Sequence, residues 1–160
     1  MPDHAPVIVW FSRDLRLHDH PALSAAAETG APVIPVYVLA GEAASHPLGA
    51  ASRWWLHHSL SRLEDGLRSL GSRLVLLQGS LAESLKTLAE ETGAAAIYHS
   101  FPIEPDEVEA VESLKALEAD GVTLKQYAAN LLYEPGSVLT QSDEPYKVFT
   151  PFYKACLSSQ

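Results

Sequence analysis

Short apolar runs alternate with longer segments of helical character along this sequence, and the alternation narrows the possible folds more than any other feature. The first run, Val7–Phe11, is continuous and rich in β-branched residues, which is typical of a strand buried on both faces of a parallel sheet. Four more strands of this kind are expected at residues 33–39, 74–78, 94–99 and 123–127.

Helices are expected between the strands, at residues 21–29, 50–70, 81–92 and 104–120, with a loop at 41–49. The longest helix carries leucines at steps of four and three residues, which places them on one face: Leu56, Leu60, Leu63, Leu67 and Leu70. Gly71 is expected to end this helix, because glycine readily adopts the left-handed conformation of a helix C-terminus.

Strands that alternate with helices form βαβ units with right-handed crossovers. We therefore predict an α/β fold, a doubly wound, Rossmann-like sheet of five parallel strands in the order 3-2-1-4-5 with helices on both faces. The length of 160 residues suits one such domain. The pattern stops near residue 130, and the segment 131–160 instead holds several prolines and a short aromatic run.

The net charge is −9, which argues against this chain holding a nucleic acid by itself. Most of the excess negative charge lies between Glu83 and Asp120. This segment contains ten acidic residues and two basic ones, Lys86 and Lys115. We interpret this acidic flank as a solvated helix surface.

Cysteine content and the N-terminus bear on the cellular compartment. The single cysteine, Cys156, excludes a disulfide framework and a multi-thiolate metal site. No apolar run approaches the roughly 20 residues of a membrane helix. No basic segment of a secretory signal precedes the first strand. We therefore expect a cytoplasmic protein without membrane contact.

In open α/β sheets, ligands bind beyond the carboxyl ends of the strands, where the strand order reverses. Here that switch point lies between the first and fourth strands, so the loops at 12–20 and 100–105 and the helix start at 50–53 are the candidate regions. No glycine-rich phosphate-binding motif follows the first strand, and no G-x-S-x-G elbow occurs. A dinucleotide dehydrogenase, a P-loop enzyme and a serine hydrolase are therefore disfavoured, and we expect no catalytic residue.

The loop after the first strand concentrates charge at Arg13, Asp14 and Arg16. One interpretation is structural, with Asp14 paired to an arginine that holds the loop in shape. The other is functional, with Arg13 or Arg53 meeting an anionic part of a ligand, because guanidinium groups suit phosphate and carboxylate.

The sequence His18-Asp19-His20 offers metal-ligating side chains, but adjacent residues rarely point at one centre. We favour a cap instead, with Asp19 or His20 capping the helix that Pro21 opens, and we expect no metal ligand.

Residues 10–23 read W-F-S-R-D-L-R-L-H-D-H-P-A-L. This stretch resembles the opening signature of the DNA photolyase and cryptochrome family, whose usual form is close to W-F-R-x-D-L-R-x-x-D-N-P-A-L. The similarity resumes in L-Y-E-P-G at 132–136 and in P-Y-K-V-F-T-P-F at 145–152, so it spans almost the whole chain.

The resemblance implies a light-harvesting function. Family members carry an N-terminal α/β domain that binds an antenna chromophore, followed by a linker and a helical domain that holds catalytic FAD. The antenna passes excitation energy to FAD, which repairs DNA or drives signalling. The resemblance implies that residues 1–130 form the antenna domain and that 131–160 begin the linker. The partner is then the C-terminal FAD-binding helical domain, which is absent here, so we expect the chain alone to be inactive and not to bind DNA.

The resemblance also implies an antenna chromophore, which is FMN or FAD, 8-hydroxydeazaflavin or methenyltetrahydrofolate. The implied contacts are Phe11, Ser12, Arg13, Val38, Arg53, His57, Phe101 and Glu104. Three positions depart from the usual pattern: Ser12 replaces a common arginine, His20 the usual asparagine, and Pro102 an aspartate that several binders keep.

Two other classes of function stay open. One is a free-standing flavin or nucleotide binder without light chemistry. The other is a protein-interaction module that docks a helical partner through exposed aromatic side chains, with Trp55, Phe149 and Phe152 as candidates.

Overall fold

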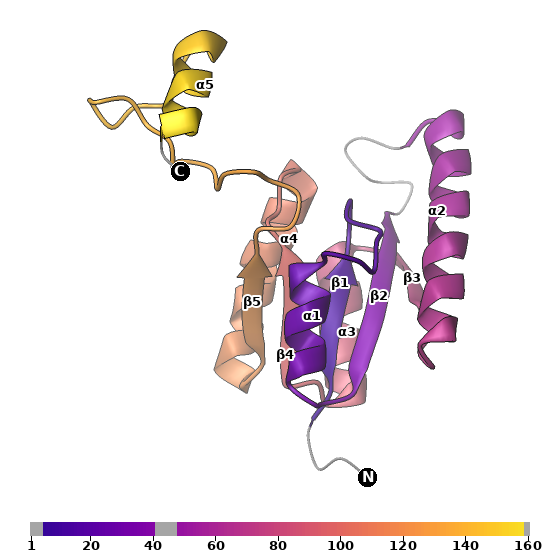
Figure 1. Ribbon diagram of the computed structural model, residues 1–160. Helices are drawn as coiled ribbons and strands as arrows, with labels where there is room; N and C mark the ends of the chain where they lie inside the picture. The colour runs from indigo at the N-terminus through magenta and orange to yellow at the C-terminus, as the bar shows by residue number, and fades with distance from the viewer. Residues whose placement is uncertain (1–4, 41–47, 159–160) are drawn as a thin grey trace. The chain divides into compact units, whose positions relative to one another are not determined.

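A computed structural model describes residues 5–40 and 48–158, so most of the loop expected at 41–49 lies outside the described residues. The strands are β1 (Val7–Phe11), β2 (Val33–Ala40), β3 (Val75–Gly79), β4 (Ala96–Ser100) and β5 (Thr123–Tyr127). They form one parallel sheet in the order β3-β2-β1-β4-β5 (Figure 1). The predicted α/β fold and strand order are confirmed.

The helices between the strands are α1 (Pro21–Glu28), α2 (Ala50–Ser69), α3 (Leu81–Thr92) and α4 (Pro105–Leu114). The helix expected to run to residue 120 changes after Leu114 into a 3₁₀ helix, η1 (Lys115–Asp120). None of the helices in the described ranges is long and apolar enough to cross a membrane.

The side chains of β1 alternate between two hydrophobic clusters, one on each face of the sheet. Val7, Val9 and Phe11 pack with residues of α1 and α2 on one face. Ile8 and Trp10 pack with residues of α3, α4 and η1 on the other. All five of these residues are at most 4% exposed, so β1 is the central strand that the continuous apolar run predicts.

The leucine stripe of α2 is buried only in part. Leu60, Leu63 and Leu67 are buried, whereas Leu70 is 71% exposed. Leu70 is the C-terminal cap residue of α2, which ends at Ser69, one residue before the end expected from the sequence. Gly71 follows with a φ of +77°, which is the left-handed conformation expected at the end of the helix.

The chain divides into two compact units, residues 1–130 and 131–160. Both hydrophobic clusters belong entirely to the first unit. The second contains α5 (Phe149–Ser158), in which Cys156 is buried and accepts a hydrogen bond at its carbonyl oxygen from Tyr133 Oη at 2.7 Å. The aromatic run that sequence reasoning left without a helix therefore begins α5.

Candidate functional site

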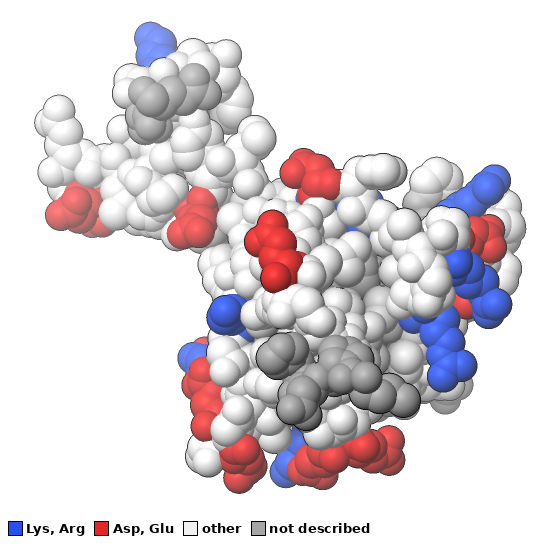
Figure 2. All heavy atoms as spheres, turned by 60° about the horizontal axis from the view of Figure 1, so that its bottom comes forward, with Lys and Arg blue, Asp and Glu red and all other residues white. Residues whose placement is uncertain are grey.

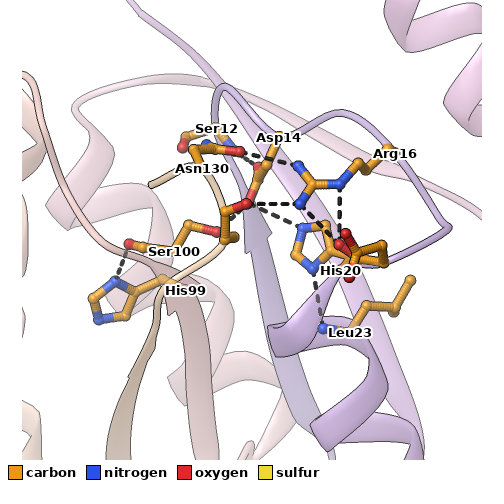
Figure 3. Close-up of polar contacts among 10 residues, drawn as sticks. Ser12, Asp14, Arg16, His20, Leu23, His99, Ser100 and Asn130 are labelled. Atoms are coloured by element: carbon orange, nitrogen blue, oxygen red, sulfur yellow. Dashed lines mark hydrogen bonds and ion pairs between the residues drawn. The ribbon is translucent and has the colours of Figure 1, made fainter. Parts of the chain in front are cut away.

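A buried carboxylate organises the loop between β1 and α1 (Figure 3). Asp14 is 2% exposed, and its Oδ1 accepts a hydrogen bond from the Ser12 amide at 2.9 Å. Its Oδ2 accepts a hydrogen bond from Ser100 Oγ at the end of β4 and lies 3.0 Å from His20 Nε2. This one side chain therefore joins the ends of β1 and β4 to the start of α1.

His20 is fully buried and caps α1, as one of the two cap candidates predicts. Its Nδ1 accepts a hydrogen bond from the Leu23 amide at 3.1 Å, which places the ring proton on Nε2, facing Asp14. The ring lies against Phe11, with the two centroids 4.7 Å apart. A buried imidazole thus bridges the loop and the first turn of α1.

Burial by itself raises the pKa of Asp14, because a carboxylate loses its hydration in the protein interior. The contacts from His20, Ser100 and the Ser12 amide stabilise the charged form and outweigh burial, so the pKa of Asp14 lies below its ordinary value. Asp14 is therefore an anion at neutral pH.

The expected pairing of Asp14 with an arginine is wrong, because the buried partners of Asp14 are His20 and Ser100. Arg13 instead pairs with Glu104 at 3.1 Å and lies 3.9 Å from Glu107. The metal interpretation of the loop finds no support in the described ranges, which hold no group of three or more histidine, cysteine, aspartate or glutamate residues with metal-binding geometry.

Four of the eight predicted contacts surround the switch point between β1 and β4. Arg13 and Glu104 meet across it, and Ser12 reaches Ser100 through Asp14. Phe101 follows β4 directly and is half-buried, with its amide donating to the Tyr127 carbonyl at 2.9 Å. Glu104 also caps α4, in a reciprocal capping box with Glu107.

Two titratable rings near this point are held neutral by burial. His99 is 2% exposed, and burial lowers its pKa. Burial also raises the pKa of Tyr37 above its ordinary value. Figure 3 shows the His99 ring turned away from Asp14, and its centroid lies 5.7 Å from that of Trp10. The charges at the switch point therefore come from the buried Asp14 carboxylate and from Arg13 with its acidic partners.

Phe11 and Val38 lie in the core, on opposite faces of the sheet. Phe11 is fully buried in the cluster with α1 and α2. Val38 is 9% exposed and belongs to the cluster with α3 and α4. Their side chains support the sheet beneath the loops and offer little surface to a ligand.

Arg53 and His57 line a separate groove of about 430 Å³ between α2 and the strands β2 and β3. Both side chains belong to exposed residues in the first half of α2. The other lining residues are mainly leucines: Leu39, Leu56, Leu60, Ser61, Glu64, Leu74 and Leu76. The groove thus combines a mainly apolar lining with the cation of Arg53.

The acidic residue of the groove is already occupied by partners. Glu64 accepts hydrogen bonds from the Leu74 amide at 2.5 Å and from Arg68 Nε at 2.6 Å. The Leu74 amide and then Arg68 lower the pKa of Glu64. Within the described ranges Arg53 has no ion pair, so its charge is the one that the groove offers to a ligand.

The groove lies on the basic side of the first unit. Arg53, Arg62 and Arg68 all belong to α2, and Arg73 follows it. Figure 2 shows most of the visible Lys and Arg side chains on the side where Figure 1 places α2, with a few Asp and Glu side chains between them, whereas larger clusters of Asp and Glu occupy other edges of this view. This charge separation favours the approach of an anion to α2 rather than to the acidic flank.

A doubly wound parallel sheet, with a loop locked at its switch point and a groove beside α2, is the architecture of a Rossmann-like α/β binding domain. Residues 7–160 match the family model of DNA photolyase. The chain therefore belongs to the DNA photolyase family.

Three relatives show how much of a family member this chain represents. It is 44% identical to a bacterial class III photolyase from Agrobacterium tumefaciens, with a TM-score of 0.88 over 98% of this chain and 32% of that one. It is 40% identical to Cryptochrome-1 of Arabidopsis thaliana, over 94% of this chain and 22% of the relative. The chain spans less than a third of the length of the curated relatives that it matches.

The third relative is an archaeal photolyase from Sulfolobus tokodaii, which is 27% identical and has a TM-score of 0.77 over 93% of this chain and 34% of that one. That structure holds two FAD molecules and is described as implying a novel light-harvesting cofactor. The matches therefore include photolyases and a cryptochrome, and this chain covers about a third or less of each.

Proposed function

We propose that this chain is the light-harvesting domain of a photolyase or cryptochrome-like protein and that it binds its antenna chromophore in the groove beside α2. In this proposal residues 1–130 form the antenna domain, 131–160 begin the linker, and the partner is an FAD-binding helical domain of the same protein. The observation that carries the proposal is the groove, which joins an apolar lining to Arg53, a cation without an ion pair among residues 5–40 and 48–158.

The residues present fit the chemistry of the candidate chromophores. Flavins, deazaflavins and reduced folates all join a planar heterocycle to a tail with phosphate or carboxylate groups. The five leucines of the groove suit the ring, and the guanidinium of Arg53 suits the anionic tail. A volume of about 430 Å³ lies within the usual range for small-ligand sites.

Arg53, His57 and the leucines have different tasks in this arrangement. Arg53 binds the acidic tail, and His57, one turn along the same face of α2, donates or accepts a hydrogen bond at the ring edge. The leucines exclude water from the ring. When bound, the chromophore absorbs light and supplies the excitation energy that reaches FAD.

The switch point is the second candidate position for the same chromophore. Arg13 and Glu104 offer opposite charges there, beside Ser12 and the half-buried ring of Phe101. Arg13 is already paired with carboxylates, which lowers its value for binding an anion. Phe11 and Val38 support this position from the core. We therefore place the anionic tail at Arg53 rather than at Arg13.

A binding titration with variants tests this assignment. Arg53→Ala removes a charged hydrogen bond worth about 1.5–3 kcal/mol, so the dissociation constant of the bound chromophore should rise roughly 10- to 150-fold. Arg62→Ala is the matched control, because Arg62 is also exposed on α2 but does not line the groove. The titrant is each of FMN, FAD, 8-hydroxydeazaflavin and methenyltetrahydrofolate, followed by fluorescence.

An unchanged affinity in Arg53→Ala contradicts the groove assignment. If Arg13→Ala weakens binding while Arg53→Ala does not, the chromophore lies at the switch point instead. If wild-type protein binds none of the four compounds, the antenna function itself is rejected for this chain.

A further inference from the structure

The Arg16 side chain joins two segments that are far apart in the sequence (Figure 3). Its Nε and Nη2 donate to the carbonyl oxygen of Asp19 at 3.1 and 2.8 Å. Nη2 also donates to the carbonyl oxygen of Ala129 at 2.7 Å, and Nη1 donates to Asn130 Oδ1 at 3.0 Å. The guanidinium thus connects the loop after β1 to the segment that follows β5.

All of these acceptors are neutral. A surface arginine that only balances charge pairs with a carboxylate, as Arg13 does with Glu104. Among the ion pairs of residues 5–40 and 48–158, none involves Arg16. The planar guanidinium reaches three acceptors in different directions, which the compact ammonium group of a lysine cannot do from one position. The contacts of Arg16 therefore depend on the planar geometry of its guanidinium group rather than on pairing with an opposite charge.

The loop that carries Arg16 is itself fixed. The Arg16 amide donates to the carbonyl oxygen of Asp14 at 2.6 Å, and the Asp14 carboxylate is held by its buried contacts to Ser100 and His20. Asp19 has a φ of +51°, a left-handed conformation that is uncommon outside glycine, and its carbonyl accepts two bonds from Arg16. The guanidinium therefore extends from a rigid base.

The segment that Arg16 holds has less support of its own. The pairing of β5 with β4 ends at Tyr127, so Ala129 and Asn130 lie beyond the described strand. Asn130 is also the last residue of the first unit, and the second unit begins at Leu131. Arg16 thus contacts the chain at the point where it leaves the α/β unit.

We propose that Arg16 is a positioning residue that fixes the direction in which the chain leaves the α/β unit after Asn130. In an antenna domain this direction matters, because transfer of excitation energy depends on the distance and orientation between donor and acceptor. That consequence rests on the function proposed above. We call the hydrogen bonds from Arg16 to Asp19, Ala129 and Asn130 the clamp. The clamp does not depend on the function of the chain.

Double electron–electron resonance on the full chain tests the clamp. Spin labels are attached at Ser24→Cys on α1 and at Ser137→Cys in the second unit, in a Cys156→Ala background, and both serines are exposed. Arg16→Ala should broaden the distance distribution about twofold, because the segment after Tyr127 then behaves as a flexible linker. Arg16→Lys should broaden it too, since the charge is kept but the fork is lost.

Arg68→Ala is the matched control, because it removes an exposed guanidinium that pairs with Glu64 on α2 and should leave the width unchanged. Circular dichroism shows whether each variant keeps the sheet. If Arg16→Ala does not fold, Arg16→Lys decides the outcome. A folded Arg16 variant with the wild-type width, or a wild-type distribution already as broad as the variant's, overturns the proposal.

The two proposals of function and clamp fail in different ways. If the chain binds none of the chromophores but the Arg16 variants broaden the distance distribution, the clamp is supported and the antenna function is rejected. If Arg53→Ala weakens chromophore binding but the Arg16 variants leave the width of the distance distribution unchanged, the antenna function is supported and the clamp is rejected.

Discussion

At the scale of single residues, Asp14 links three parts of the first unit. Its carboxylate is buried, contacts three elements, and is stabilised as an anion by the hydrogen bonds it accepts. An anion in the interior is tolerated only when its acceptor sites are filled, as they are here. The same residue fixes the loop from which both Arg13 and Arg16 extend.

Asp14→Asn should lower the free energy of unfolding by about 1–3 kcal/mol at neutral pH, because the amide nitrogen faces donors at Ser100 and His20. The lowered pKa of Asp14 means that its ionisation stabilises the fold above about pH 4 and that this contribution is lost as the pH falls further. The difference between wild type and variant should therefore shrink in acid.

Urea unfolding at neutral pH and below pH 4 measures this difference. Asp65→Asn, on the exposed surface of α2, is the control and should change stability little at either pH. A difference between wild type and Asp14→Asn that stays constant across the two conditions would show that the charge of Asp14 contributes nothing.

The sequence predicts the charged loop but not its partners. The W-F-S-R-D-L-R stretch marks a concentration of charge after a buried strand, and this part is correct. The pairing depends on tertiary position: Ser100 is 86 residues from Asp14, and Asn130 is 114 residues from Arg16. No local pattern carries this information, so the roles of Ser100 and Asn130 were missed, and Asp14 was assigned an arginine.

At the scale of elements, the leucines of α2 and its C-terminal cap differ in burial. Leu63→Ala should lower the free energy of unfolding by about 2–5 kcal/mol, because Leu63 is 3% exposed and its loss leaves a cavity against the sheet. Leu70→Ala is the matched variant and should change stability by less than about 0.5 kcal/mol, since Leu70 is 71% exposed.

Thermal or urea unfolding of the two variants distinguishes them. Equal losses would mean that Leu70 is buried like Leu63 and would contradict its exposure in the structure.

Three elements have the bounds expected from the sequence: β1, α3 and β5. Apolar runs predict the strands and helical spacing predicts the helix. Ends were less accurate, as in the change from α4 to η1 after Leu114. The helix α5 was missed because Pro151 lies near its start and the surrounding segment is rich in turn residues.

At the scale of the whole molecule, the charged residues and the hydrophobic core are unevenly distributed along the chain. The core belongs to residues 1–130, and the arginines of α2 lie apart from the acidic residues between Glu83 and Asp120. The sequence predicted the acidic flank, and the family resemblance pointed to Arg53 and His57. The groove that brings these two residues together with leucines of α2, β2 and β3 required the structure.

The absorption spectrum of the purified chain tests the antenna function most directly. The spectrum is recorded before and after incubation with FMN, FAD, 8-hydroxydeazaflavin and methenyltetrahydrofolate, and after removal of free compound. We predict that the wild-type chain retains a band between the near-ultraviolet and the blue for at least one compound and that Arg53→Ala retains less of it. Retention of none of the four by the folded chain would contradict the light-harvesting function.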